Sequence, residues 1–225
     1  MLYAVGDIHG RLDKLDELLA ALPLRPEDRL VFLGDYVDRG PDTRGVIDRL
    51  LQVAAERPTV FLMGNHESMF LDFLGWKGPQ YFGADVFIAN GGAETLLSYD
   101  YFEQPTPRPQ SFSLPPAHAA FFRSLRMHHV EGDFLFVHAG LGRALLRADH
   151  LDQALRGVRA EELLWDRSTM DLPHRLGVTI VYGHTPRTDF GVRWNQPYSI
   201  GIDTGAVYGG PLTAIRLPDE TLFQV

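Results

Sequence analysis

The stretch LVFLGDYVDRG at positions 30 to 40 decides the fold. Four apolar residues lead directly into Gly34, and Asp35, Asp38 and Arg39 follow it before the next glycine. A short apolar run that ends at a glycine is typical of a buried strand. The stretch therefore predicts a strand that carries a cluster of charged side chains at its carboxyl end.

The same pattern recurs along the chain. Other apolar runs end in GDIHG at 6–10, GNHE at 64–67, HAG at 138–140 and YGHTP at 182–186. The polar side chains at these tips are Asp7, His9, Asn65, His66, Glu67, His138 and His184. Ligands of open α/β sheets bind at the carboxyl ends of strands, where side chains far apart in the sequence can meet. We therefore expect the tips to converge on one site.

One tip alone carries little information. A histidine at a strand end is more often a structural residue with satisfied hydrogen bonds than a ligand. Asp38 and Arg39 by themselves would suggest a surface ion pair that contributes little to stability. Because the pattern appears at five strand ends of one chain, each beside a glycine, we interpret the tips as a metal site.

The rest of the first half predicts a layered α/β fold. Apolar runs at 2–5, 29–33 and 59–63 alternate with helical patterns at 12–22 and 46–54. This alternation is typical of α/β domains. Helices are also expected at 66–74 and near 117–125, and further β runs at 134–138, 178–184, 198–205 and 212–217.

The segment 76–116 interrupts this alternation. It contains many aromatic residues and glycines and the proline cluster QPTPRPQ, although GAETLLSYDYF inside it could hold a short helix. The segment is too short for a core of its own. We expect it to be a cap insertion within a single domain of residues 1–225; a domain boundary is the alternative.

The composition limits the chemistry. The chain has 225 residues, 45% of them hydrophobic, and no cysteine, so a bound metal must be held by oxygen and imidazole ligands. A net charge of −8 argues against a broad nucleic-acid surface.

The start MLYAVGDIHG lacks a basic region followed by a long apolar one, and no run approaches the roughly 18 apolar residues of a membrane span. We expect a soluble cytoplasmic protein with no membrane partner; its oligomeric state cannot be inferred.

Taken in order, the five tip motifs closely resemble those of the calcineurin-like metallophosphoesterases. The resemblance is to the phosphoprotein phosphatase branch, which includes bacteriophage lambda phosphatase and bacterial diadenosine tetraphosphate hydrolases, and it spans residues 6 to about 207. It implies a β-sandwich flanked by helices in four layers, with a di-metal centre at one edge.

The resemblance also implies the metal ligands. They are Asp7 and His9 on a first ion, Asp35 on both ions, and Asn65, His138 and His184 on a second. Carboxylate, imidazole and amide ligands suit manganese, our first choice, and also iron or zinc. A bridging carboxylate keeps two ions about 3.5–4 Å apart, and the pair produces a hydroxide that attacks phosphorus directly.

Four other residues are implied to act on the substrate. His66 would be the general acid, and Asp38 would orient it through a hydrogen bond. Arg39 would clamp the phosphate, for which a planar guanidinium is well suited. Arg167 in LLWDR is expected as a second phosphate-binding arginine. A surface arginine at a helix end is the alternative, since the acidic Asp166 precedes it.

The remaining polar residues are expected to support the structure. Glu67 would cap or brace its loop, and Asp203 would either support the metal site or hold a turn. Five histidines outside the strand tips are expected to be structural or on the surface. They are His118, His128, His129, His150 and His174.

The sequence favours a serine/threonine protein phosphatase that hydrolyses phosphate esters. The alternative is a hydrolase of dinucleoside polyphosphates such as diadenosine tetraphosphate, because both need the same metal core. A non-catalytic phosphate-sensing module is disfavoured, since His66, Asp38 and Arg39 are all present. The compact length favours the protein phosphatase.

The aromatics of the segment 76–116 could stack an adenine, or they could pack the segment onto the body. They are Trp76, Tyr81, Phe82, Phe87, Tyr99, Tyr101 and Phe102.

Overall fold

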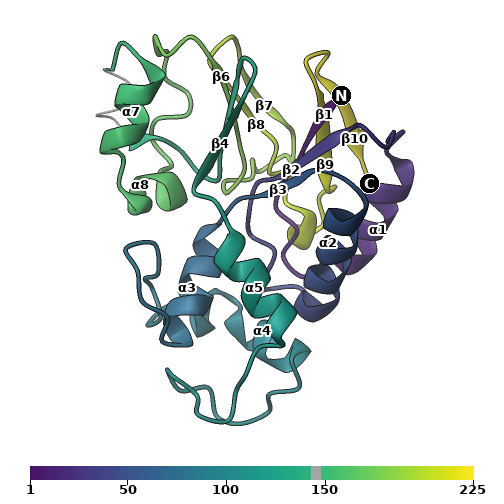
Figure 1. Ribbon diagram of the computed structural model, residues 1–225, viewed down its shortest axis with the longest axis vertical. Helices are drawn as coiled ribbons and strands as arrows, with labels where there is room; N and C mark the ends of the chain where they lie inside the picture. Colours follow the sequence, from purple (N-terminus) through teal and green to yellow (C-terminus); the bar gives the residue numbers. More distant parts are fainter. Residues whose placement is uncertain (143–147) are drawn as a thin grey trace.

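The computed structural model describes residues 1–142 and 148–225, in which two five-stranded sheets lie between helices (Figure 1). The first sheet has the order β10-β9-β1-β2-β3 and the second the order β4-β5-β6-β8-β7. The strands are β1 (Leu2–Val5), β2 (Arg29–Phe32), β3 (Thr59–Phe61), β4 (His128–Glu131), β5 (Phe134–Val137), β6 (Thr179–Tyr182), β7 (Arg193–Asn195), β8 (Ser199–Gly201), β9 (Thr213–Leu217) and β10 (Thr221–Gln224). The expected β-sandwich flanked by helices is confirmed.

Helices cover the outer faces of both sheets. The α-helices are α1 (Leu12–Ala21), α2 (Thr43–Glu56), α3 (Asn65–Phe73), α4 (Gly92–Ser98), α5 (Pro116–Ser124), α7 (Leu151–Gly157) and α8 (Ala160–Trp165), with short 3₁₀ turns η1 (Ile88–Asn90) and η2 (Ala206–Tyr208). In Figure 1, α1 and α2 lie on one side of the strands and α7 and α8 on the other. The helix pattern at 46–54 becomes α2, whose Asp42 cap accepts a hydrogen bond from the Gly45 N–H at 2.8 Å.

The alternation of side chains along each strand places the core on both faces of each sheet. In β2, Leu30 and Phe32 belong to the cluster under α1 and α2, whereas Val31 faces the other sheet. Strands buried on both faces read as continuous apolar runs, which is why the sequence shows them clearly. The cluster between the sheets is made of Ala4, Val31, Leu33, Leu62, Phe136, Val181, Ile200, Ile202, Ile215 and Leu217.

The segment 76–116 packs beside α3 and α5 and contributes η1 and α4. Phe87 and Tyr101 belong to the large core cluster, and Trp76, Tyr81 and Phe82 pack against it. Tyr99 stacks on Phe70, with ring centroids 6.4 Å apart. Phe102 is 77% exposed. Most aromatics of the segment are therefore used for packing.

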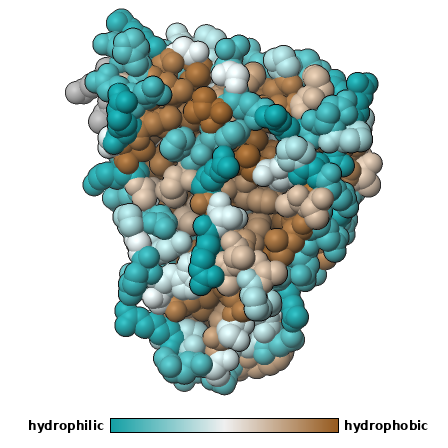
Figure 2. Space-filling view, viewed as in Figure 1, coloured by the Kyte–Doolittle hydropathy of each residue, from teal (hydrophilic) through white to brown (hydrophobic). Residues whose placement is uncertain are grey.

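The surface mixes hydrophilic residues with separate hydrophobic areas on the face shown in Figure 2. Large exposed hydrophobic side chains come from different elements, among them Val130, Trp194 and Tyr208. Among the described residues, every helix is too short or too polar to cross a bilayer.

Replacing Phe136 by alanine tests the inter-sheet core. Phe136 is fully buried between the sheets, so we expect the free energy of unfolding in urea to fall by about 3–5 kcal/mol. Phe102→Ala is the matched control and should change it by less than about 0.5 kcal/mol. A similar small change in both variants would contradict the assigned core.

Candidate metal centre

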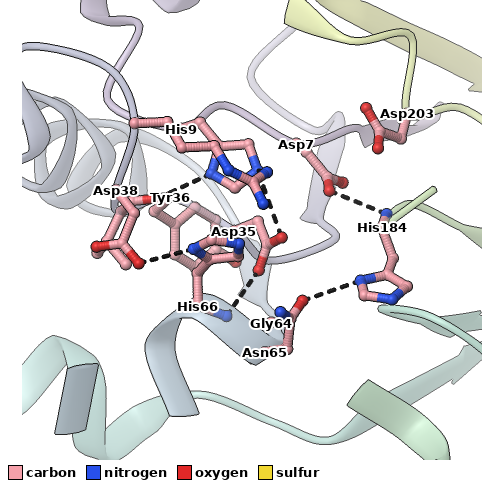
Figure 3. Close-up of polar contacts among 12 residues, drawn as sticks. Asp7, His9, Asp35, Tyr36, Asp38, Gly64, Asn65, His66, His184 and Asp203 are labelled. Atoms are coloured by element: carbon pink, nitrogen blue, oxygen red, sulfur yellow. Dashed lines mark hydrogen bonds and ion pairs between the residues drawn. The ribbon is translucent and has the colours of Figure 1, made fainter. Parts of the chain in front are cut away.

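The polar tips of five strands meet at one edge of the sandwich. Figure 3 shows side chains from the loops after β1, β2, β3 and β6 directed toward a common region. His138, after β5, joins them, because its Nε2 lies 3.0 Å from Asn65 Oδ1. Apart from Arg39, which is half-buried, the predicted tip residues are at most 6% exposed: Asp7, His9, Asp35, Asp38, Asn65, His66, Glu67, His138 and His184. The predicted convergence is confirmed.

The backbone of the tips is strained. In the described part of the chain nine non-glycine residues have positive φ, and five of them belong to the predicted site: His9, Asp35, Asp38, Arg39 and His184. Such conformations cost about 1–3 kcal/mol each and persist only where the surroundings enforce them. Gly34, with φ of 102°, lies so close to the backbone of Gly64 that a Cβ would be 2.6 Å from its nitrogen. Two strand ends thus meet in direct backbone contact.

Glu67 braces this contact. Its Oε2 accepts hydrogen bonds from the N–H groups of Asp35 and Gly64 at 2.9 and 2.8 Å. Its Oε1 accepts from Tyr36 and Val37 at 2.7 and 3.2 Å. One buried carboxylate therefore holds the loop after β2 against the start of α3, which is the supporting role expected for Glu67.

Asp35 divides the site into two halves. Its Oδ2 lies 3.5 Å from His9 Nε2, and its Oδ1 lies 3.4 Å from His138 Nε2. Oδ1 also accepts a hydrogen bond from the His66 N–H at 3.1 Å. Burial raises the pKa of this carboxyl, but nearby imidazoles, His138 first, outweigh burial and hold the pKa well below its usual range. An ionised carboxylate with one oxygen toward each half suits a bridging ligand.

In the half around His138, three atoms that could bind a metal ion lie close together: one amide oxygen and two imidazole nitrogens. His138 Nδ1 donates to the Leu33 carbonyl at 2.8 Å, and its Nε2, which carries the lone pair when the ring is neutral, lies 3.0 Å from Asn65 Oδ1. Burial lowers the pKa of His138, but the Asp35 charge outweighs burial and raises it. His184 Nδ1 lies 2.9 Å from the same amide oxygen. Because His184 Nε2 accepts from Arg167, the neutral His184 ring carries its proton on Nδ1 and donates it to Asn65 Oδ1. The lone pair of a neutral His138, in contrast, would repel that oxygen unless a cation lay between them. This arrangement fits a divalent cation.

In the half around His9, an acidic oxygen lacks a partner. His9 Nδ1 donates to the Val37 carbonyl at 2.9 Å, and the other ring nitrogen, Nε2, points toward Asp35. Asp7 Oδ2 accepts from the His184 N–H at 2.9 Å, whereas its buried Oδ1 has no hydrogen-bond partner among the described residues. Burial, together with Asp203 and Asp35, raises the pKa of Asp7 well above its usual value. A cation beside Asp7 Oδ1 would satisfy this oxygen and allow the carboxyl to ionise.

His66 and Asp38 form a hydrogen-bonded pair beside these halves. His66 Nδ1 lies 2.7 Å from Asp38 Oδ2, and the ring packs edge-on against His9 with centroids 4.6 Å apart. Burial, and then the charges of Arg39, His138 and Arg167, lower the pKa of His66 to about 4, despite the opposing effect of Asp35. An anion bound between the arginines would favour the protonated imidazole.

Two arginines flank the cluster. Arg39 Nη1 lies 2.7 Å from His9 Nε2, and Arg167 Nε donates to His184 Nε2 at 3.2 Å. The Asp166 carboxylate accepts hydrogen bonds from the N–H groups of Gly142 and Ser168 at 3.0 and 2.9 Å. It therefore does not draw the Arg167 side chain away from the site. The structure therefore places Arg167 beside the other predicted residues.

Three further residues lie around the site. Asp203 lies beside Asp7 in Figure 3, and its Oδ1 accepts from the Gly205 N–H at 3.0 Å, so it holds a turn. Two of these residues were not predicted from the sequence: Thr95, whose hydroxyl donates to Asp38 Oδ1 at 2.7 Å, and Tyr208, whose ring lies 5.4 Å from the Arg39 guanidinium. Both are distant in sequence from the residues that they contact, so no local pattern could identify them.

Comparisons with known proteins agree with this geometry. Among curated proteins, the bis(5′-nucleosyl)-tetraphosphatase PrpE (asymmetrical) of Anoxybacillus flavithermus is 29% identical over 98% of this chain and 92% of that protein. The protein of the same name from Bacillus cereus (strain AH187) is 27% identical over the same shares.

Solved structures share the fold. One described as a putative diadenosine tetraphosphatase has a TM-score of 0.65 and 23% identity, and the match covers 100% of this chain and 92% of that one. A serine/threonine phosphatase from Saccharomyces cerevisiae has a TM-score of 0.62 and 18% identity over 100% and 78%. The sequence signature of the calcineurin-like phosphoesterases matches residues 2–208. The chain belongs to the calcineurin-like phosphoesterase family.

Proposed function

We propose that the chain is a two-metal hydrolase that cleaves dinucleoside polyphosphates. The observation that carries this proposal is the buried Asp35 carboxylate, which lies between two groups of metal-binding side chains with Arg39 and Arg167 at their margins. Buried carboxylates and imidazoles suit cations, whereas exposed guanidinium groups suit phosphate oxygens. Together they suit a phosphoryl group held between metal ions and arginines.

The proposed ligands follow from the two halves of the site. Asp7, His9 and Asp35 would hold one ion, and Asp35, Asn65, His138 and His184 the other. Oxygen and nitrogen donors without sulfur suit manganese, our first choice, as well as iron and zinc. Such ions, when bound, lower the pKa of a shared water to about 7 and neutralise charge on phosphoryl oxygens.

The other side chains would bind the substrate and move a proton. Arg39 and Arg167 would each bind phosphoryl oxygens, in place of the imidazole nitrogens that they contact in this structure. His66 would donate the Nε2 proton to the leaving oxygen, while Asp38 fixes the orientation of the ring through Nδ1. The leaving oxygen needs this proton most when it departs as an alkoxide.

Two observations favour a dinucleotide over a phosphoprotein. The curated relatives named above are bis(5′-nucleosyl)-tetraphosphatases. The Tyr208 ring is 54% exposed and adjoins Arg39, so a base could stack on it while a phosphate binds the arginine. The phosphoprotein phosphatase favoured by the chain length has a weaker basis, because the solved protein phosphatase shares only the fold.

Replacing Asp35 by alanine tests the bridging role. We expect elemental analysis of manganese-loaded protein to show the loss of at least one of two ions per chain, because each half loses a carboxylate oxygen. Asp16→Ala, which removes an exposed carboxylate paired with Arg49, is the control and should retain both ions. Retention of two ions by Asp35→Ala would refute the bridge.

Replacing His66 by asparagine tests the general acid. Hydrolysis of phosphate esters with poor leaving groups should slow by about 10²–10⁴-fold, and that of activated aryl phosphates far less. Metal content, measured on the same samples, should be unchanged. His129→Asn, which removes an imidazole of β4 that pairs with Glu131, serves as the control. Equal losses on both kinds of ester would exclude His66 as the acid.

A direct comparison of substrates tests the proposed specificity. Manganese-loaded protein should prefer diadenosine tetraphosphate to a phosphothreonine peptide by at least about a hundredfold in kcat/KM, or roughly 2.7 kcal/mol. Tyr208→Ala should reduce this preference by about tenfold through lost base stacking, whereas Phe102→Ala should not. Chromatography of the products distinguishes asymmetric from symmetric cleavage. Preference for the peptide would instead identify a protein phosphatase.

A further inference from the structure

The loop that carries Asp38 and Arg39 needs support from outside itself. Both residues have φ of 71°, and neither is a glycine. A left-handed conformation costs an L-residue about 1–2 kcal/mol, so two in succession are stable only with compensating contacts. These residues also form the part of the site nearest to His66 and His9.

Thr95, in α4, supplies one compensating contact at Asp38. Its Oγ1 accepts from the Asp38 N–H at 2.8 Å and donates to Asp38 Oδ1 at 2.7 Å. Since this uses the only hydroxyl hydrogen of Thr95, the Thr43 hydroxyl, 3.1 Å away, must donate to Thr95. Asp38, Thr43 and Thr95 are all fully buried. With Oδ1 occupied in this way, Asp38 directs Oδ2 to His66 Nδ1.

The turn before α4 supports Arg39. The Gly91 carbonyl accepts from the Arg39 N–H at 3.0 Å. Gly91 has φ of 93°, and a Cβ there would lie 2.8 Å from the Arg39 nitrogen, so only glycine allows this approach. The two supports are four residues apart, at the start of α4.

Contacts with α2 and α5 hold α4 in place. The Ser98 hydroxyl accepts from the Arg44 N–H at 2.8 Å. The Tyr99 hydroxyl lies 2.7 Å from His118 Nδ1, and His118 Nε2 lies 2.9 Å from Asp48. Because the C-terminal end of α4 is tied to α2 both directly and through His118 of α5, the Thr95 hydroxyl has a fixed position relative to Asp38.

We propose that Thr95 is a positioning residue for the Asp38–His66 pair, so that the segment 76–116 completes the site. Thr95 acts through Asp38, and its loss would allow the Asp38 carboxylate to rotate away from His66 Nδ1. This inference rests on the proposed general-acid role of His66 but not on the identity of the natural substrate.

The test uses the dependence of the rate on the leaving group. Rates for aryl phosphates of graded phenol acidity are measured for the parent protein, Thr95→Ser and Thr95→Val. In Thr95→Val, kcat for the poorest leaving group should fall by about tenfold to a hundredfold, with little change for 4-nitrophenyl phosphate. Thr95→Ser retains the hydroxyl and should restore the parent dependence.

The control removes another buried hydroxyl. Thr213 is fully buried in β9, and its hydroxyl bonds Thr204 and Gln224. Thr213→Val should leave the leaving-group dependence unchanged. If Thr95→Val does not fold, Thr95→Ala is measured in its place. In an Asp38→Asn background, Thr95→Val should add no further leaving-group effect, because the pair is already broken.

Each failure has a distinct signature. If the folded Thr95→Val or Thr95→Ala protein, with full metal content, keeps the parent dependence or loses activity equally on all esters, the positioning role is overturned. The role is also overturned if adding Thr95→Val to Asp38→Asn makes the rate depend still more steeply on the acidity of the leaving group. If the parent protein hydrolyses no phosphate ester or anhydride, the proposed function itself fails.

Discussion

The structure depends on an electrostatic constraint at one edge of the sandwich. Asp7, Asp35 and Asp203 are buried close together, and the imidazoles of His9 and His138 lie 3.5 and 3.4 Å from the Asp35 carboxylate. Burying ionised carboxylates is costly unless they pair with a cation. Among the described residues of the site, Arg39 and Arg167 provide permanent positive charge, and both lie at the margin. Divalent cations in the two halves would remove the conflict, which is why we interpret the edge as a two-metal centre.

Rigid support explains how the constraint is tolerated. The tips after β1, β2, β5 and β6 follow strands whose last three residues are buried, and Glu67 joins two tips through backbone N–H groups. The strained residues at positive φ are held by this frame and by the start of α4. Strain of this kind costs stability, but it aims ligand atoms before any ion binds. The inter-sheet core therefore holds the strands from which the loops of the site extend.

Part of this architecture could be read from the sequence. The tips were predictable because strands buried on both faces give apolar runs, and a glycine followed by a metal-binding side chain marks each end. The strands β4, β7 and β10 were not predicted, since HHVE, RWN and TLFQ are short and all three lie at sheet edges. The contribution of Thr95 could not be predicted either, because its contact with Asp38 spans 57 positions. Side-chain contacts of this range depend on tertiary packing, which leaves no local pattern.

The central claim is that the site holds two ions bridged by one carboxylate. Electron paramagnetic resonance of the parent protein, titrated with manganese, tests it most directly. We predict two manganese ions per chain and a spectrum of spin-coupled ions, because a shared carboxylate and water keep the ions about 3.5–4 Å apart. A single bound ion, or two ions with uncoupled spectra, would contradict the account.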